Sequence, residues 1–250
     1  MAEGSNSDFV LSIEELTVSF DGFKAVDNVT MYIDKNELRV IIGPNGAGKT
    51  TLLDLICGKT SASSGYIKFN NHELTKMSEH QIVHAGVGRK FQTPSIYENL
   101  SVYENLEVSY PQARNVLSAI FFKTTETVDQ EIHRIAKEIF LEEFLEMEAS
   151  LLSHGQKQWL EIGMLLIQDP ELLMLDEPVA GMSVKERDQT ADLLKRICQG
   201  RSVIVIEHDM DFVEKIASKV TVLHQGKLLA EGPMHEVKSN EQVIEVYLGH

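Results

Sequence analysis

The sequence has little cysteine and no long apolar run, and both shortages exclude whole classes of protein. Cys57 and Cys198 are the only 2 cysteines among 250 residues, and no CxxC spacing occurs. Neither a disulfide framework nor a structural zinc site is therefore supported. No apolar run approaches the roughly 20 residues that span a bilayer, and residues 1–9 lack the basic and apolar regions of a signal peptide. We expect a cytosolic chain that forms no membrane pathway itself.

Positive charge is also scarce. Lysine and arginine number 23 against 38 aspartates and glutamates, which gives a formal net charge of -15. Because binding to nucleic acid needs clustered positive charge, and no Lys/Arg run is present, nucleic acid is not an expected partner. The hydrophobic fraction of 43% is ordinary for a folded protein. The length fits one large domain, so we predict a single domain over 1–250 with distinct lobes.

The first part of the chain has the composition of β-strands. Strands are indicated at 9–20, 25–33 and 38–42, and polar turn residues at 21–22 and 34–36 separate them. We predict a β lobe at this end of the chain.

The later part of the chain alternates between strand and helix patterns. Apolar positions recur at helical spacing after Thr50, and the apolar runs 172–176 and 202–208 flank a helical stretch at about 184–197. This order predicts a parallel sheet and an α/β fold class. The acidic stretch 130–149, which contains no glycine or proline, predicts a helical lobe inserted in that core.

Residues 43–50, GPNGAGKT, match the pattern G-x-x-x-x-G-K-[ST]. A glycine cluster alone is compatible with a simple turn, but a buried strand before it and a helix after it favour phosphate binding. Backbone N–H groups and the helix N-terminus can hold phosphates, while Lys49 can reach the β- and γ-oxygens and the Thr50 hydroxyl can ligate Mg²⁺. The segment therefore predicts a nucleotide site.

Two acidic residues and a histidine follow the later apolar runs. Asp176 and Glu177 end LLMLDE, and His208 follows SVIVIE. Side chains at the carboxyl ends of parallel strands project toward bound ligands. We expect Asp176 to hold Mg²⁺ through water, Glu177 to accept the proton of the attacking water, and His208 to contact the γ-phosphate. The alternatives are two solvated acids at a strand end and a surface histidine.

The segment LSHGQ, residues 152–156, has two compatible interpretations. Ser153 and Gln156 have the spacing of a capping box that opens an amphipathic helix. A serine hydroxyl, Gly155 and a helix N-terminus also form an anion site. Trp159, within the same helix, is expected in the core and receives no catalytic role.

Taken in order, these motifs together with Gln92 resemble the ATP-binding cassette of ABC transporters over essentially the whole chain. The resemblance implies a P-loop, RecA-like core with a parallel sheet, an N-terminal antiparallel β lobe, and a helical lobe at about 93–155. It also implies ATP hydrolysis with Mg²⁺ as cofactor. In that family the LSHGQ segment acts in trans, on the ATP held by the opposite subunit of a head-to-tail dimer.

The resemblance further implies a set of site residues. Phe20 is similar to the aromatic residue that stacks on adenine, Thr51 to the contact with the α-phosphate, and Gln92 to the residue joining magnesium to the membrane subunit. The expected nucleotide-binding residues are Phe20, Gly43, Pro44, Asn45, Gly46, Ala47, Gly48, Lys49, Thr50 and Thr51. The expected catalytic residues are Glu177, His208 and Gln92; the metal ligands are Thr50, Gln92 and Asp176; the residues acting in trans are Ser153, His154, Gly155 and Gln156.

Two positions depart from the commonest family pattern. His154 replaces the usual first glycine of the signature, and we expect it to alter phosphate contact or the rate of dimer formation. Ser183 stands where an aspartate often follows the catalytic strand, which puts in doubt the communication between two sites that the aspartate mediates. Neither change removes a catalytic group.

Local segments, among them LLMLDEPVAGMS and the ending VIEVYLGH, resemble the ATP-binding subunits of branched-chain amino acid and urea importers, most closely the urea type. The resemblance implies a peripheral protein on the cytoplasmic face of the inner membrane. Its partners would be permease subunits, a second ATPase subunit in a homodimer or heterodimer, and indirectly a periplasmic binding protein. The alternatives are a branched-chain amino acid importer and a non-transport ABC ATPase acting on a soluble partner.

We further predict that the permease docks on residues 93–106, just after Gln92. Ile96, Tyr97 and Leu100 are the expected apolar anchors. Core packing inside the helical lobe is the alternative for each anchor.

Overall fold

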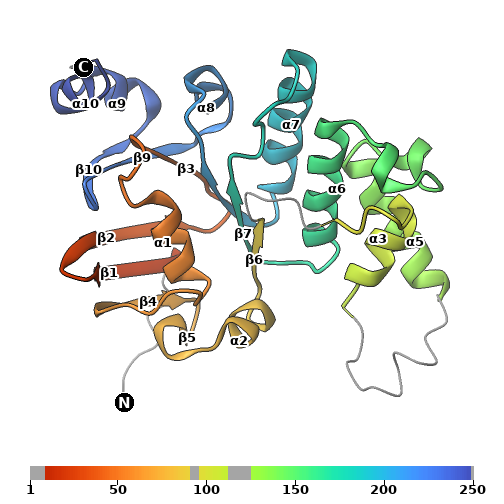
Figure 1. Ribbon diagram of the computed structural model, residues 1–250, viewed down its shortest axis with the longest axis horizontal. Helices are drawn as coiled ribbons and strands as arrows, with labels where there is room; N and C mark the ends of the chain where they lie inside the picture. The colour runs from red at the N-terminus through yellow and green to blue at the C-terminus, as the bar shows by residue number, and fades with distance from the viewer. Residues whose placement is uncertain (1–8, 91–95, 112–124, 249–250) are drawn as a thin grey trace. The chain divides into compact units, whose positions relative to one another are not determined.

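The computed structural model describes residues 9–90, 96–111 and 125–248 (Figure 1). The chain forms two compact units. The first unit comprises 1–89, 171–177 and 194–250, and the second comprises 90–170 and 178–193. Gln92 and residues 93–95 lie outside the described residues. The assignment of one domain to 1–250, with a helical lobe at 93–155, stays a prediction.

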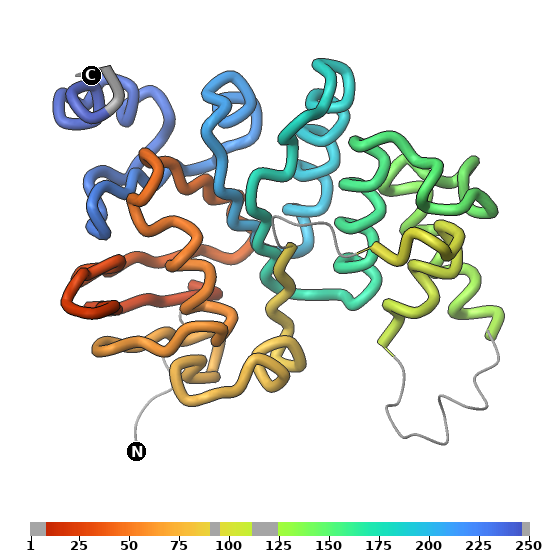
Figure 2. The backbone as a smooth tube through the Cα atoms, viewed as in Figure 1, coloured from red at the N-terminus to blue at the C-terminus, as the bar shows by residue number. Residues whose placement is uncertain are grey.

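An antiparallel sheet forms the first part of the first unit. β1 (Phe9–Phe20) and β2 (Phe23–Asp34) are a hairpin, because Asp21 and Gly22 both adopt positive φ, 49° and 88°, as a tight two-residue turn requires. Figure 2 shows this hairpin as a continuous red tube. β4 (Ser64–Phe69) pairs with β1 and β5 (His72–Glu73) with β4, in the order β2-β1-β4-β5. The predicted antiparallel lobe is confirmed.

A six-stranded sheet forms the rest of the framework, in the order β10-β9-β3-β8-β7-β6. β3 pairs in parallel with β8 and β9, β7 pairs in parallel with β8, and β10 is antiparallel to β9. Every residue of β3, β7 and β8 is buried, as expected for strands covered on both faces. The strands are β3 (Leu38–Ile42), β6 (Val87–Lys90), β7 (Leu172–Asp176), β8 (Ser202–Ile206), β9 (Lys219–His224) and β10 (Lys227–Gly232).

The helices of the first unit bury apolar stripes against these sheets. α1 (Lys49–Ile56) contacts β2 and buries Leu52, Leu53, Leu55 and Ile56, the positions with helical spacing in the sequence. The other helical segments of this unit are a 3-10 turn at Leu74–Lys76, α2 (Glu79–His84), α8 (Met210–Ile216), α9 (Met234–Ser239) and α10 (Glu241–Leu248). The helix predicted after Thr50 is confirmed.

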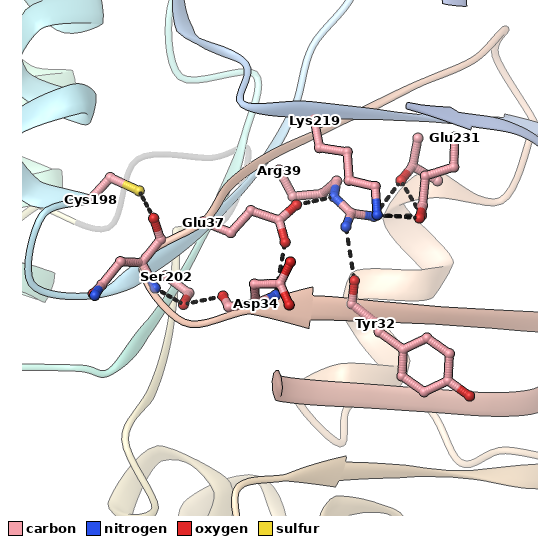
Figure 3. A network of polar contacts seen from close by, with 10 residues as sticks. Tyr32, Asp34, Glu37, Arg39, Cys198, Ser202, Lys219 and Glu231 are labelled. Atoms are coloured by element: carbon pink, nitrogen blue, oxygen red, sulfur yellow. Dashed lines mark hydrogen bonds and ion pairs between the residues drawn. The ribbon is translucent and has the colours of Figure 1, made fainter. Parts of the chain in front are cut away.

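A buried arginine joins the two sheets of the first unit (Figure 3). Arg39 lies on β3 with no exposed surface, and its Nη2 donates to the carbonyl of Tyr32 on β2 at 2.8 Å. Its Nε donates to Glu37 Oε1 at 2.5 Å. Its Nη1 donates to Glu231 Oε2 at 2.5 Å and to Thr221 Oγ1 at 2.8 Å. A buried charge is tolerated when it is paired and hydrogen-bonded, so this network stabilises the junction between β2, β3 and β10.

The second unit is helical. Its elements are α3 (Val102–Ser109), α5 (Glu126–Glu138), 3-10 turns at Glu142–Phe144 and Ala149–Leu151, α6 (His154–Leu166) and α7 (Val184–Ile197) up to Leu193. α3, α5 and α6 contact one another, and a Cβ on Gly163 of α6 would lie 2.4 Å from Ile139 Cδ1. Trp159 is 5% exposed and its indole nitrogen donates to Thr190 Oγ1 on α7 at 2.9 Å, which confirms its expected place in the core.

The stretch 130–149, which the sequence assigns to a helical lobe, contains most of α5 and the 3-10 turn Glu142–Phe144 and is not one continuous helix. α5 ends at Glu138, and Phe140 adopts a left-handed conformation with φ 63°. The amide of Leu141 then donates to the carbonyl of Ala136 at 2.8 Å, a bond typical of a helix C-terminus closed by a left-handed residue. Phe140 tolerates this conformation while its ring packs edge-on against Trp159, with centroids 5.2 Å apart.

Among the described residues, none of the helices has the length and the apolar composition that a membrane span requires.

Candidate active site

The glycine-rich loop lies between β3 and α1 in the first unit. Two of its glycines are required by space: a Cβ on Gly43 would lie 2.2 Å from the carbonyl oxygen of Leu223, and one on Gly48 2.3 Å from that of Ala25. Both also have positive φ, 156° and 98°. The loop therefore runs close to neighbouring backbone at its two ends and continues directly into the N-terminus of α1, the arrangement that suits an anion.

The Lys49 side chain reaches back over the glycine-rich loop that precedes it. Its Nζ donates to the carbonyl oxygens of Gly43 at 2.8 Å and Pro44 at 3.1 Å. Burial lowers the pKa of Lys49, while the charges of Glu177 and Asp176 act in the opposite direction. The ammonium group thus interacts electrostatically with both carboxylates that were predicted at the sheet edge, Asp176 and Glu177.

Thr50 and Asp176 are brought together, as the sequence predicted for two ligands of one metal. The Thr50 Oγ1 donates to Asp176 Oδ2 at 3.3 Å, and Asp176 is 3% exposed at the end of β7. Burial raises the pKa of Asp176, and the charge of Arg89 and the Thr50 hydroxyl partly offset that rise. A hydroxyl and a carboxylate are hard oxygen donors, which is the ligand chemistry that Mg²⁺ requires. These two residues fit a magnesium site, whereas the expected third ligand, Gln92, lies outside the described residues.

Glu177 points differently from Asp176 because the backbone changes conformation between them. Glu177 has left-handed backbone with φ 47°, and its amide donates to the carbonyl of Ile206 on β8 at 3.0 Å. Its Oε1 lies 3.5 Å from Nδ1 of His208, whose side chain is 69% exposed. The two residues expected to act in hydrolysis are therefore neighbours at the carboxyl edge of β7 and β8, and a strained backbone position of this kind is common at functional sites.

Two residues that sequence reasoning missed support this edge. Glu207 is 1% exposed, and its Oε2 accepts from the amide of His208 at 3.0 Å, so it fixes the backbone that carries the histidine. Arg89, at the end of β6, donates from Nη1 to Asp54 Oδ1 of α1 at 2.6 Å and to Cys57 Sγ at 3.1 Å. Neither residue belongs to a motif, because Glu207 directly follows β8 and Arg89 precedes a second cation, Lys90, in β6, so local sequence patterns gave no signal for either.

The remaining nucleotide-binding candidates take ordinary places in the first unit. Phe20 ends β1 with 49% exposure and pairs with Phe23 across the hairpin, so an aromatic face is accessible there. Ala47 is buried, and its amide donates to the carbonyl of Pro44 at 3.1 Å. Asn45 and Gly46 are exposed at the tip of the loop, and Thr51 is half-buried on α1.

The LSHGQ segment begins α6 in the second unit. Ser153 is the N-cap, its hydroxyl accepts from the amide of Gln156, and the Gln156 side chain accepts from the amide of Ser153, so the predicted capping box is confirmed. His154 Nε2 lies 3.0 Å from the carbonyl oxygen of Ala180. The Ser153 hydroxyl also lies 3.4 Å from Glu186 Oε1 of α7.

The expected docking segment is described from residue 96 onward. Tyr97 is 55% exposed, whereas Ile96 and Leu100 are half-buried. Asn105, fully buried, holds this stretch by accepting from the amide of Tyr97 at 2.8 Å and donating to its carbonyl at 3.0 Å. An exposed aromatic ring on a fixed backbone is compatible with docking, which stays a prediction.

Two family models match the sequence. One, described as ABC transporter, matches residues 26–180; the other, described as branched-chain amino acid ATP-binding cassette transporter, matches residues 227–250. The second match covers β10, α9 and α10. The sequence pattern in the last part of the chain thus carries information that the catalytic motifs do not.

Relatives of similar length align along nearly the whole chain. The branched-chain amino acid transport ATP-binding protein BraF of Pseudomonas aeruginosa is 34% identical over 96% of this chain and 98% of its own. LivG of Escherichia coli, which carries the same description, is 34% identical over the same shares. Among solved structures, the ADP conformation of an ATP-binding cassette of an ABC transporter superimposes with a TM-score of 0.85 at 30% identity, over 97% of this chain and 99% of that one. A nucleotide-free cassette gives 0.83 at 30% identity, over 97% and 100%.

Proposed function

Because the chain belongs to the ABC transporter family, in which it is an ATPase subunit, we propose that it energises the import of branched-chain amino acids. The observation that supports branched-chain amino acids as the transported molecules is the match of residues 227–250 to the branched-chain amino acid cassette model. The relatives BraF and LivG are named for the same cargo, and neither is named for urea. These findings favour the branched-chain amino acid alternative over the urea assignment expected from local segments.

We propose the following division of work in the first unit. The loop 43–48 and the N-terminus of α1 hold the phosphates through backbone N–H groups, and Lys49 neutralises their charge. Thr50 and Asp176 would hold Mg²⁺, which would supply neutralisation of charge on the transferred phosphoryl group. Phe20 would stack on the adenine, and Thr51 would contact the α-phosphate. Gln92, which lies outside this unit and outside the described residues, would be a further magnesium ligand, as the family resemblance implies.

Hydrolysis needs a base and a positioned water. Glu177 would accept the proton of the attacking water, because its carboxylate interacts with the charge of Lys49 and lies 3.5 Å from His208 at the same sheet edge. His208, held by Glu207 through its own amide, would orient the γ-phosphate for in-line attack. The pairing of these two side chains at 3.5 Å is the geometric support for this assignment.

The second unit would serve the nucleotide of a facing subunit. The segment formed by Ser153, His154, Gly155 and Gln156 would face the ATP bound by the opposite cassette of a head-to-tail pair, either a second copy or a related ATPase, and the Ser153 side chain would make the contact. The N-terminus of α6 suits that role, because Ser153 and His154 are exposed there and the helix dipole favours an anion at that end. We propose that the whole chain acts as one cassette domain in this pair.

Transport requires partners in the membrane. We propose that permease subunits dock near Tyr97, on residues 93–106, and that a periplasmic binding protein acts through the permease. The cassette would then be peripheral on the cytoplasmic face of the inner membrane.

Uptake of labelled leucine and labelled urea tests the cargo. We expect deletion of this chain to abolish high-affinity uptake of leucine, isoleucine and valine and to leave urea uptake intact. Complementation should restore uptake with the wild-type chain and fail with Glu177→Gln. Loss of urea uptake alone would restore the urea assignment, and unchanged uptake of both would favour an ATPase that acts on a soluble partner.

A further inference from the structure

The two departures from the family pattern are close in the structure, because His154 contacts the loop that ends at Ser183. His154 Nε2 lies 3.0 Å from the carbonyl oxygen of Ala180, in the loop 178–183 that follows β7. A Cβ on Gly181 would lie 3.1 Å from His154 Cδ2, and Gly181 has φ 72°. The imidazole therefore packs on a glycine whose conformation other residues rarely adopt, which leaves room for the ring.

A carboxylate on α7 makes the second connection. Glu186 Oε2 accepts from the amide of Ser183 at 2.8 Å and from its hydroxyl at 2.7 Å. The other oxygen, Oε1, accepts from the Ser153 hydroxyl at 3.4 Å. It also lies so near Gly155 that a Cβ there would be 2.4 Å away. The carboxylate thus touches the N-terminus of α6 and the end of the loop 178–183 together (Figure 1 shows α6 beside α7).

The charge state of Glu186 suits this bridge. The hydrogen bonds from the Ser183 hydroxyl and amide lower the pKa of Glu186, so the side chain is an ionised acceptor at neutral pH. Ser183 keeps the acceptor in place as a neutral donor; an aspartate at 183 would bring a second negative charge against it. The serine and the glutamate are therefore compatible partners at this position.

We propose that His154 and Glu186 are positioning residues that lock Ser153 to the loop 178–183, so that both segments move together. The inference rests on the proposed function, in which Ser153 contacts the nucleotide of the facing subunit. The loop begins directly after Glu177 in the chain. A displacement of Ser153 on contact with the nucleotide would therefore also displace the segment next to the proposed catalytic carboxylate. A side chain held in advance in its working orientation loses less freedom when the two subunits close on ATP.

Hydrogen exchange on the full-length chain tests the bridge without any partner. His154→Ala should speed amide exchange in both 154–157 and 180–183, and His154→Gln, whose amide nitrogen reaches about as far as Nε2, should restore slow exchange. His133→Ala, which removes a half-exposed histidine on α5, is the matched control and should change neither segment. Faster exchange confined to 154–157, or no change in either segment, would overturn the proposal.

The ATPase rate of the assembled transporter tests the functional consequence. His154→Ala and Glu186→Gln should each lower kcat about tenfold, the usual effect of one hydrogen bond, and leave the affinity of the isolated chain for MgATP unchanged. In a Ser153→Ala background neither substitution should lower kcat further, because both act through Ser153. Additive losses, or loss of MgATP affinity, would overturn the proposal. If the unmodified complex hydrolyses no ATP, the proposed function fails, and the exchange experiment still decides whether the bridge exists.

Discussion

The Nδ1 atom of His208 lies 3.5 Å from the Oε1 atom of Glu177, although 31 positions separate them in the sequence (208 − 177 = 31). The contact exists because β7 and β8 are adjacent parallel strands that end at the same edge of the sheet. It places a candidate base beside a candidate phosphate contact.

Replacing the base should separate nucleotide binding from hydrolysis. We expect Glu177→Gln to bind MgATP normally and to hydrolyse it roughly 10²- to 10⁴-fold more slowly, because the amide keeps the shape of the side chain but cannot accept a proton. The variant should accumulate as an ATP-bound dimer, which light scattering with MgATP would detect. Turnover at the wild-type rate would show that Glu177 is not the base. A variant that holds ATP and stays monomeric would instead indicate an obligate heterodimer.

Lys49→Ala should lose nucleotide binding itself. The side chain supplies the charge expected at the β- and γ-phosphates, so we expect affinity for MgATP to fall roughly 10- to 100-fold. Calorimetric titration measures this change, and Lys35→Ala, on the exposed turn after β2, is the control. Because Lys49 also holds the carbonyls of Gly43 and Pro44, circular dichroism should first establish that the variant is folded. Unchanged affinity in a folded variant would remove Lys49 from the site.

The strands β1, β2, β3, β7 and β8 were predictable from sequence, whereas β4, β5, β6, β9, β10 and the tie between the two sheets were not. Strands 9–20 and 38–42 follow directly from runs of apolar and β-branched residues, and the structure places them at those limits. Arg39 appears in the sequence only as a charged residue inside an apolar run. Its partners Tyr32, Thr221 and Glu231 come from three other strands, and local patterns contain no information on such pairing.

Glu231→Gln should destabilise the protein in a pH-dependent way. Burial raises the pKa of Glu231, but the hydrogen bond from Lys219 and the charge of Arg39 outweigh it and leave that pKa below its ordinary value of 4.5. A carboxylate with a lowered pKa stabilises the fold fully above its unfolded-state pKa and loses this contribution as pH falls through the folded value. We expect the variant to lose about 1–3 kcal/mol at pH 7, and less as the pH falls below 4.5. Urea unfolding at several pH values measures the difference, and a constant difference would contradict the account.

The candidate site was predictable as far as motifs reach. The loop 43–50, Asp176 and Glu177 could be identified because short segments of chain specify them, and the structure brings Thr50 and Asp176 within 3.3 Å. The supporting residues Glu207 and Arg89 belong to no motif. Their roles arise from tertiary contacts, a buried carboxylate beneath His208 and a guanidinium between β6 and α1, which only the fold reveals.

The fluorescence of a buried tryptophan can be used to follow unfolding of the second unit. Trp159 is the single tryptophan, and its indole N–H donates to Thr190, whose hydroxyl donates in turn to the carbonyl of Glu186 at 2.8 Å. Thr190→Val keeps the shape of the side chain but leaves the indole without this acceptor, so we expect a loss of about 1–3 kcal/mol in unfolding free energy. Thr190→Ser keeps the hydroxyl and should lose less. Unfolding followed by the fluorescence of Trp159 makes the comparison, and equal losses would show that the hydrogen bond contributes nothing.

The central claim is that this chain converts ATP hydrolysis into import of branched-chain amino acids. The most direct measurement is ATP hydrolysis by the complete transporter in lipid vesicles, with its binding protein loaded with leucine or offered urea. The account predicts that leucine stimulates hydrolysis, that urea does not, and that Glu177→Gln abolishes the stimulated rate. Stimulation by urea and not by leucine, or a stimulated rate that survives Glu177→Gln, would contradict it.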